Sequence, residues 1–237
     1  MVTRLTEIVV DTAEMGPLAR FWSALLDWPI TIDEADEINI SGEHLDIVFG
    51  DVPEPKTVKN RVHLDLASSS LAAQKETVAR ALELGARHID IGQGDKPHVA
   101  LADPEGNEFC VLEPRPEYGD TGAIAAIVQG CHDPADAGSF WSAATGGPIV
   151  LRNERVALIR LSDPGPFLAL VAVTEAKTVK NRVHIDVRPY AGDDQKAEVD
   201  RLIALGARRI DIGQGDVPWE VLADPEGNDF CVLTPGD

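Results

Sequence analysis

The sequence predicts an α+β fold made of four βαβββ modules, and two observations carry this prediction: an internal repeat, and strand and helix patterns that recur with it. The run KTVKNRVH occurs at residues 56–63 and again at 177–184, and both IDIGQGD and LADPEGN also recur 121 positions later. FWSA recurs with an offset of 119, so two residues were gained or lost in between. The chain is therefore a tandem duplication in which each residue has a twin.

A duplication of 237 residues predicts two domains close to the common domain size. We expect a first domain over residues 1–116 and a second over residues 117–237. The modules within them are expected at residues 1–56, 57–116, 117–177 and 178–237.

The first module shows the expected order of elements. Residues 4–11 alternate in polarity and predict a strand, and residues 17–26 place apolar side chains at helical spacing. Three short strands should follow, at 29–33, 37–41 and 45–50.

The second module repeats this order. Residues 61–67 predict a strand with His63 and Asp65 on the face opposite Val62, Leu64 and Leu66. A helix over 71–84 should end at Gly85, which suits a C-terminal cap. Strands at 88–91, 97–102 and 108–113 complete the module, and DPEGN at 103–107 has the composition of a hairpin turn, for which we expect a structural role.

The second half should follow the same plan. Helices are expected near 136–145 and 192–205, and the third module should close with a strand at 167–173. Residues 114–122, rich in Pro, Gly and charge, form the predicted linker between the halves.

The composition limits the classes of molecule that the protein can bind. The chain carries 40 acidic and 21 basic residues, a net charge of −19, which disfavours nucleic acid and anionic membranes. No apolar run is long enough to span a membrane, and no export signal is recognised, so we expect a soluble cytoplasmic protein. The acidic surface either keeps the protein soluble or favours a cationic ligand.

The three cysteines are expected to be unpaired. Cys110 and Cys231 are twins inside apolar runs, and equivalent positions in two separate cores will not meet. Cys131 has no cysteine twin. The run Cys131-His132-Asp133 resembles a catalytic trio, but neighbours along an extended chain point in different directions, so we expect no catalytic thiol.

Four βαβββ modules, a histidine on the first strand of modules two and four, and a DPEGN hairpin before the last strand together resemble the vicinal oxygen chelate superfamily. That superfamily includes glyoxalase I, bleomycin-resistance proteins and type I extradiol dioxygenases. The run NRVHLDL followed by LGAR and LADPEGNEFCVLEP is similar to the small glyoxalase-like domain, present twice. The resemblance implies two cupped half-barrel domains of the glyoxalase/bleomycin-resistance fold, each half of the chain forming one complete ligand cavity.

Metal-dependent members of the superfamily hold a divalent ion through His, Gln or Glu on the first strand and Glu on the last strand of the modules. Carried over to this sequence, the resemblance implies His63 and Glu113 as ligands. Glu7 and either His44 or Asp46 of the first module are further candidates, and the hypothetical set is Glu7, His44, His63 and Glu113. This gives one possible site for Zn, Ni, Mn or Fe, in the N-terminal domain.

The second half lacks this set. His184 remains, but Thr234 replaces Glu113, Ala126 or Ile127 replaces Glu7, and the strand at 167–173 offers no ligand. One imidazole does not hold a metal. If His184 has another task, such as a hydrogen bond to a ligand or to Asp186, its twin can have the same task beside Asp65, which favours a protein without metal.

The residues expected to contact a ligand are those that the module pattern places in the cavities: His63, His98, Glu113, His184 and Trp219. Trp219 is the twin of His98, so the two cavities should differ. Trp219 either stacks on a flat or cationic ligand or packs in the core. His98 either exchanges protons near neutral pH or is an exposed strand residue.

A cationic cluster also recurs, with Lys56, Lys59 and Arg61 in the first half and Lys177, Lys180 and Arg182 in the second. It either binds a carboxylate or phosphate, or has the structural task of pairing with acidic neighbours where the modules cross.

These patterns favour a glyoxalase-like protein that binds a small hydrophobic or cationic molecule, without metal, as resistance or sequestration proteins do. The alternative is a metal-dependent lyase, isomerase or dioxygenase with its site in the N-terminal domain. A third reading is a scaffold with one degenerate half. Fusion of two halves is compatible with a monomer or a homodimer.

Overall fold

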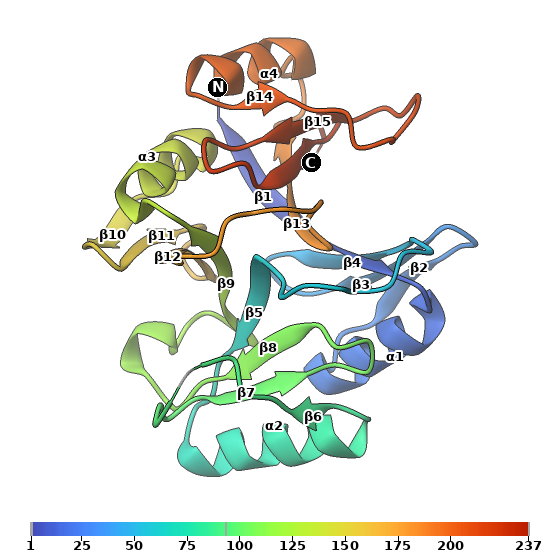
Figure 1. Ribbon diagram of the computed structural model, residues 1–237, viewed down its shortest axis with the longest axis vertical. Helices are drawn as coiled ribbons and strands as arrows, with labels where there is room; N and C mark the ends of the chain where they lie inside the picture. The colour runs from blue at the N-terminus through green and yellow to red at the C-terminus, as the bar shows by residue number, and fades with distance from the viewer. Residues whose placement is uncertain (1, 93, 237) are drawn as a thin grey trace.

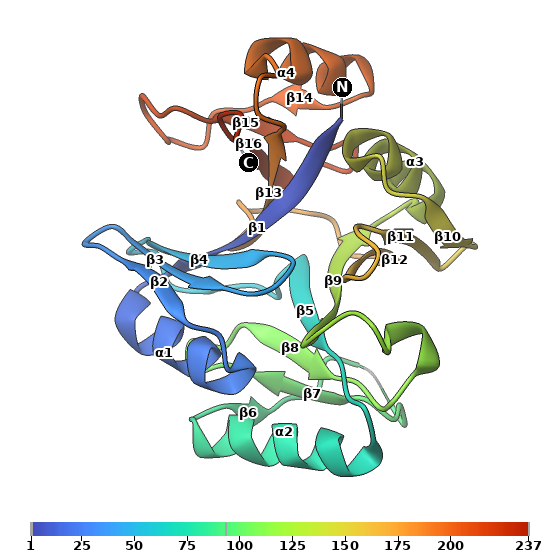
Figure 2. The same cartoon turned by 180° about the vertical axis from the view of Figure 1, so that it is seen from behind.

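The structure, a computed structural model, describes residues 2–92 and 94–236. Within these residues the chain forms two eight-stranded sheets and four α-helices, shown from opposite sides in Figures 1 and 2. The α+β fold of cupped half-barrels predicted from the sequence is confirmed.

Each half of the chain supplies two modules in the predicted order. Module one contains β1 (Thr3–Thr12), α1 (Met15–Leu26), β2 (Ile30–Asp33), β3 (Glu37–Ser41) and β4 (Asp46–Asp51). Module two contains β5 (Val62–Leu66), α2 (Leu71–Glu83), β6 (Arg87–His88), β7 (Val99–Ala102) and β8 (Glu108–Val111). The linker carries one turn of 3-10 helix, η1 (Pro116–Tyr118).

The second half repeats this order. Module three contains β9 (Ile124–Cys131), α3 (Pro134–Thr145), β10 (Ile149–Arg152), β11 (Val156–Arg160) and β12 (Phe167–Ala172). Module four contains β13 (Val183–Pro189), α4 (Gln195–Ala204), β14 (Arg208–Arg209), β15 (Glu220–Ala223) and β16 (Asp229–Val232).

The predicted elements are confirmed, with differences at their ends. The strand expected at 88–91 is wrong beyond His88, because the Asp90 side chain accepts a hydrogen bond from Gly92 N at 2.8 Å and turns the chain. The strand expected at 108–113 ends at Val111. Gly85, just after α2, has φ of +110°, as expected of a glycine that ends a helix.

The pairing of modules differs from the expectation that each half forms its own cavity. One sheet has the strand order β14-β15-β16-β13-β1-β4-β3-β2 and joins modules one and four. We call it the 1–4 sheet. The other, with the order β10-β11-β12-β9-β5-β8-β7-β6, joins modules two and three, and we call it the 2–3 sheet. The limits of the two domains along the sequence stay a prediction.

The strands that join the modules are antiparallel in both sheets. β1 pairs with β13, so that Val9 faces His184, and β5 pairs with β9, so that His63 faces Val128. Because β5 and β13 are twins with nearly the same sequence, either could accept β1 or β9 as its neighbour. The sequence repeat therefore predicts the modules but does not decide which of them share a sheet.

Modules that follow each other in the chain contact through their helices instead. Phe21 and Trp22 of α1 pack edge-on against Phe109 of β8, with ring centroids 6.2 and 5.0 Å away. The twins Phe140 and Trp141 pack in the same way against Phe230. These aromatic groups belong to one hydrophobic core that runs through the molecule on the helix side of both sheets.

The hairpins predicted for DPEGN close this side of the fold. Asp103 N donates to Asn107 O, and the Asp103 carboxylate accepts from Asn107 N and from Trp22 Nε1. Asp224 does the same for Trp141 in module four. The structural role expected of this loop is therefore visible in its contacts. In the described part of the chain, no helix is both long and apolar enough to cross a membrane.

Candidate functional site

Both sheets turn one face to the helices and leave a second face, which we call the helix-free face. On β5 the apolar Val62, Leu64 and Leu66 lie in the core, so alternation places His63 and Asp65 on the helix-free face. Alternation on β13 does the same for the twins of these two residues. Each sheet therefore carries one His-x-Asp pair beside the strand that joins its two modules.

A cysteine completes a small polar group on each sheet. β5 and β8 are parallel, and Asp65 lies opposite Cys110. His63 Nε2 is 3.5 Å from Asp65 Oδ1, and the possible ligand atoms of His63, Asp65 and Cys110 all lie within 4.8 Å of one another. Burial, followed by the negative charge of Asp65, raises the pKa of the Cys110 thiol well above its usual range. The thiol therefore stays protonated and donates to Asp65.

The group on the 1–4 sheet has the same geometry and is more deeply buried. His184 Nε2 is 3.5 Å from Asp186 Oδ1, and Cys231 lies beside them. Burial raises the pKa of Asp186. Asp186 Oδ1 and His184 Nδ1 are buried without a hydrogen-bond partner, and so is Asp65 Oδ1 on the other sheet. Such atoms are uncommon in folded proteins and indicate where a ligand or water could bind.

These groups fit a divalent metal in part. Imidazole, carboxylate and thiolate are all zinc ligands, and the buried oxygens without partners leave coordination capacity on each aspartate. The thiol would have to lose its proton, which the charge of a bound cation favours. His63, Asp65 and Cys110 would hold such an ion in the 2–3 sheet, and it would polarise a substrate oxygen there.

The metal ligands expected from the sequence are not brought together. Glu113 lies beyond the end of β8 and accepts a hydrogen bond from Arg115 Nε at 2.6 Å. Burial raises its pKa, but the hydrogen bond and charge of Arg115, with smaller contributions from a backbone hydrogen bond and His98, together outweigh burial, and the net shift is downward. Cys110, not Glu113, stands beside His63, because Glu113 falls in the alternation with Phe109 and Val111, which face the core.

The other two expected ligands lie in module one, and β1 and β4 of that module belong to the 1–4 sheet. Glu7 faces Asp186 across β1 and β13 and accepts from Arg188 Nη2 at 2.7 Å. His44 lies in the turn between β3 and β4, close to Gly122 and Gly165. The proposed set of Glu7, His44, His63 and Glu113 is thus divided between the two sheets.

His98 and Trp219 precede β7 and β15, and the structure does not place either among the His-Asp-Cys groups. His98 is half-buried and close enough to Glu113 to influence the pKa of that carboxyl. Trp219 is 38% exposed, so the reading that it packs in the core is wrong. Its role in stacking on a ligand stays a prediction.

A pocket of about 160 Å³ opens on the helix-free face of the 2–3 sheet. Its apolar wall is formed by Val128, Val171 and Val173, and His63 lies at its polar side. Lys59, Asn60, Arg61 and Glu175 surround it together with Gly130. The pocket thus combines an apolar surface with a histidine and cationic groups.

Beyond this pocket, the linker covers the helix-free face of the 2–3 sheet. Tyr118 of η1 packs edge-on against Phe167 of β12, with ring centroids 5.6 Å apart, and Arg160 lies over the Phe167 ring at 4.7 Å. Tyr118 also contacts the apolar cluster that contains Cys110 and Leu112. The linker therefore fills this part of the face and leaves the end near His63 open.

The same positions on the 1–4 sheet are charged. Glu7, Asp46 and Arg188 occupy its helix-free face, and burial raises the pKa values of Glu7 and Asp46. The hydrogen bond from Arg188 opposes this shift at Glu7 without cancelling it. The two sheets thus share the His-Asp-Cys group and differ in what surrounds it.

All three cysteines are free and buried, as expected. Burial, with the nearby charge of Glu226, raises the pKa of Cys131 to about 12, so this thiol is not a nucleophile at neutral pH.

Comparison with known proteins agrees with this architecture. The sequence model of the glyoxalase-like domain matches residues 7–112 and 126–233. Comparison with curated protein sequences gives no match. Among solved structures, a proposed dioxygenase from Bacillus subtilis subsp. subtilis str. 168 is similar, with a TM-score of 0.68 and 13% identity, covering 99% of this chain and 87% of its own.

Glyoxalase I from Zea mays is similar to the same degree. Its TM-score is 0.68 at 12% identity, covering 98% of this chain and 92% of its own. At such identities these likenesses show the fold alone, whereas the family match extends over most of the sequence. The chain belongs to the glyoxalase-like domain family, with two such domains in tandem.

Proposed function

We propose that this glyoxalase-like protein binds a small organic molecule in the pocket of the 2–3 sheet. The observation that carries the proposal is the pocket of about 160 Å³, with Val128 and Val171 on its apolar wall and His63 at its polar side. An apolar surface with few polar groups is the usual composition of a small-molecule site. Asp65, whose Oδ1 lies 3.5 Å from His63 Nε2, would orient the imidazole at the polar side of the pocket.

A matched pair of substitutions tests this proposal. Val128 faces His63 on β9, and its twin Val9 faces His184 on β1. Val128→Phe should fill the pocket and abolish binding of small aromatic molecules in a panel that includes neutral, cationic and anionic members, measured by calorimetry. Val9→Phe makes the same change on the other sheet and should keep binding. Loss of binding in both variants, or in neither, contradicts the proposal.

The second candidate is a metal-dependent lyase, isomerase or dioxygenase, and the His-Asp-Cys groups favour it. Their donors lie within 4.8 Å of one another, and their aspartates have buried oxygens without partners. The metal ligands proposed for this second candidate are no longer the set expected from the sequence. They are His63, Asp65 and Cys110 and, by symmetry, their twins His184, Asp186 and Cys231.

Elemental analysis separates the two candidates. The protein, purified without a chelator or a metal-affinity tag and then incubated with Zn, Ni, Mn or Fe(II), should contain far less than one metal ion per chain if it only binds organic molecules. A bound ion that is lost in His63→Ala would favour the metal-dependent enzyme with its site in the 2–3 sheet, and a further ion that is lost only in His184→Ala would place a second site in the 1–4 sheet.

A further inference from the structure

The repeated cationic segments, residues 54–61 and 175–182, lie opposite each other and line a groove of about 790 Å³ between the two sheets. Lys59, Asn60 and Arg61 line both this groove and the pocket beside His63. The groove is thus continuous with the proposed ligand site on one side. Comparison of each cation with its twin shows that the two sides of the groove are not equivalent.

On the side of the 1–4 sheet, the cations are neutralised within the protein. Lys180 Nζ is 2.6 Å from Asp11 Oδ2, and Arg182 Nη2 is 2.8 Å from Glu105 Oε2. Arg182 also donates to the Glu54 carbonyl at 2.6 Å. Each positive charge here has a carboxylate partner.

The lysine on the other side has lost its partner. Val9 and Val128 are twins, so the position equivalent to Asp11 on β9 is Gly130, which carries no carboxylate. Within residues 2–92 and 94–236, no acidic group forms an ion pair with Lys59, the twin of Lys180. The exposed carboxylate of Glu175 is near enough for Lys59 to contribute, after backbone hydrogen bonds, to lowering the pKa of Glu175.

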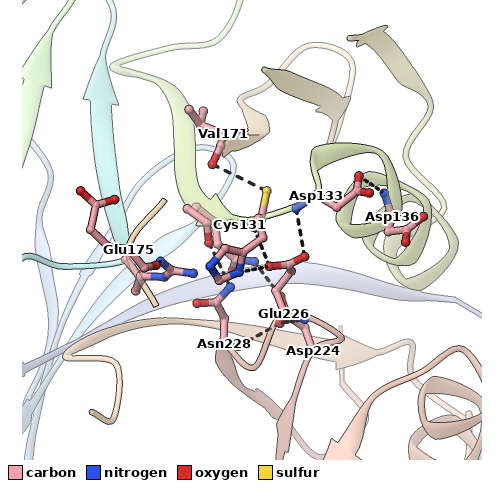
Figure 3. Close-up of polar contacts among 12 residues, drawn as sticks. Cys131, Asp133, Asp136, Val171, Glu175, Asp224, Glu226 and Asn228 are labelled. Atoms are coloured by element: carbon pink, nitrogen blue, oxygen red, sulfur yellow. Dashed lines mark hydrogen bonds and ion pairs between the residues drawn. The ribbon is translucent and has the colours of Figure 1, made fainter. Parts of the chain in front are cut away.

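The arginine on this side has lost its partner as well. Glu105 and its twin Glu226 each accept from two backbone N–H groups at the start of a helix, Glu105 from Ala13 and Glu14 and Glu226 from His132 and Asp133. The twins differ in the remaining contact, because Glu226 lies 3.1 Å from His132 Nδ1 where Glu105 has Arg182 Nη2 at 2.8 Å. Figure 3 shows Glu226 turned toward Asp133 at the start of α3. Among the residues that the structure describes, Arg61 keeps only the bond from Nη1 to the Glu175 carbonyl, at 2.6 Å.

The guanidinium of Arg61 is therefore under-satisfied. Its Nε and Nη2 are both buried without a hydrogen-bond partner, whereas Arg182 leaves only Nε in that state. A buried charged donor without an acceptor is costly, and a carboxylate or phosphate would supply two oxygens in the planar geometry that a guanidinium matches. Lys59 would add a second positive charge within the same pocket.

We infer that Lys59 and Arg61 form an anion-binding site, and that the ligand of the 2–3 pocket carries a carboxylate or phosphate group held there while its apolar part lies against Val128 and Val171. This inference rests on the proposed function for the apolar part, but not for the anion. The net charge of −19 repels anions in general, so binding here depends on these two local cations. A site made of two cations would repel the cationic ligand that the acidic composition suggested.

The test uses inorganic phosphate and benzoate as probes, titrated by calorimetry into the full chain. Lys59→Gln should weaken the binding of both anions about tenfold, the effect of losing one charge-assisted contact. The twin change Lys180→Gln should leave the affinity for both anions unchanged. Both lysines are exposed, so neither variant should disturb folding, which circular dichroism checks. Higher salt should weaken binding in the wild type.

The outcomes separate the two claims. The anion site is supported if phosphate binds and only Lys59→Gln weakens its binding. If benzoate then binds no more tightly than acetate, the apolar pocket is not a ligand site. If neither anion binds at millimolar concentration, or if Lys59→Gln and Lys180→Gln weaken binding equally, the inference is overturned. Binding of benzylammonium in place of benzoate also overturns it.

Discussion

The two sheets present the same His-Asp-Cys group on faces of opposite character. On the 1–4 sheet this group is surrounded by charged and polar side chains, and on the 2–3 sheet by apolar ones, although the strands pair in the same register. Glu7, Asp46 and Asn39 of the 1–4 sheet correspond to Ala126, Phe167 and Leu158 of the 2–3 sheet, and Arg188 corresponds to Ala67.

The difference shows that a duplicated fold can keep the same His-Asp-Cys group in both halves while the side chains around it differ. The 1–4 sheet neutralises its charges internally, through Arg188 with Glu7 and Lys180 with Asp11. The 2–3 sheet has apolar side chains at those positions, and in the described part of the chain Lys59 and Arg61 have no carboxylate partner. The cations beside the 2–3 sheet can therefore bind an anion from solution. The cations beside the 1–4 sheet already bind carboxylates of the protein itself.

The largest expected effect concerns the apolar face of the 2–3 sheet. Phe167→Ala should lower the free energy of unfolding by about 3–5 kcal/mol, because the ring is only 4% exposed and packs between Tyr118 and Arg160. The same change at its twin, Asp46→Ala, should cost less than about 1 kcal/mol, because Asp46 is only half-buried. Urea denaturation measures both, and equal losses would contradict the contrast between the faces.

A second prediction concerns the loop aspartates, Asp103 and Asp224. Burial raises the pKa of Asp103 to about 6, against the opposing hydrogen bonds from Asn107 and Trp22. Asp224 has a further donor, Gln129 Nε2 at 2.7 Å, where the first half has Val10.

Because the folded state holds this proton more tightly than the unfolded state, whose pKa is about 4, the stabilisation from Asp103 is fully present below pH 4 and is lost as the pH rises through about 6. The loss should reach about 2–3 kcal/mol. Urea denaturation of the wild type and Asp103→Asn at pH 4 and 7 measures it. The wild type should lose stability relative to the variant between these values, and a relative gain would mean that the donors keep Asp103 ionised.

The smallest expected effect comes from a substitution that makes the 1–4 side of the groove resemble the 2–3 side. Asp11→Asn removes the carboxylate partner of Lys180, which lies 2.6 Å away, and should create a second, weaker phosphate site. Calorimetry should then show two phosphates per chain in place of one, with a change in stability of less than about 1 kcal/mol. An unchanged stoichiometry would show that the internal partner is not what prevents anion binding on this side.

Much of the fold could be predicted from the sequence because its signals are local. The repeat identified the modules, the spacing of apolar residues identified helices such as α1, and Asp103 to Asn107 identified a hairpin. The pairing of modules could not be predicted, because β5 and β13 share nearly the same sequence and each is a suitable neighbour for β1 or β9.

The candidate site was predicted in part for a related reason. His63 and His184 were expected in the cavities because they alternate with core residues, and the structure places both on the helix-free faces. Cys110 was read only as a small apolar residue, although it is out of phase with Phe109 and therefore faces His63. The unpaired state of Lys59 and Arg61 depends on Gly130 and Glu226, which lie far away in the sequence, and no local pattern records such a relation.

The central claim is that the 2–3 sheet, and not the 1–4 sheet, holds the ligand. The most direct measurement is methyl NMR of the wild-type protein titrated with benzoate, followed at two pairs of twins on the helix-free faces. Val128 and Ala169 on the 2–3 sheet should shift with a saturating curve, while Val9 and Val48 on the 1–4 sheet should not. Shifts at Val9 and Val48 with none at Val128 and Ala169 would contradict the account.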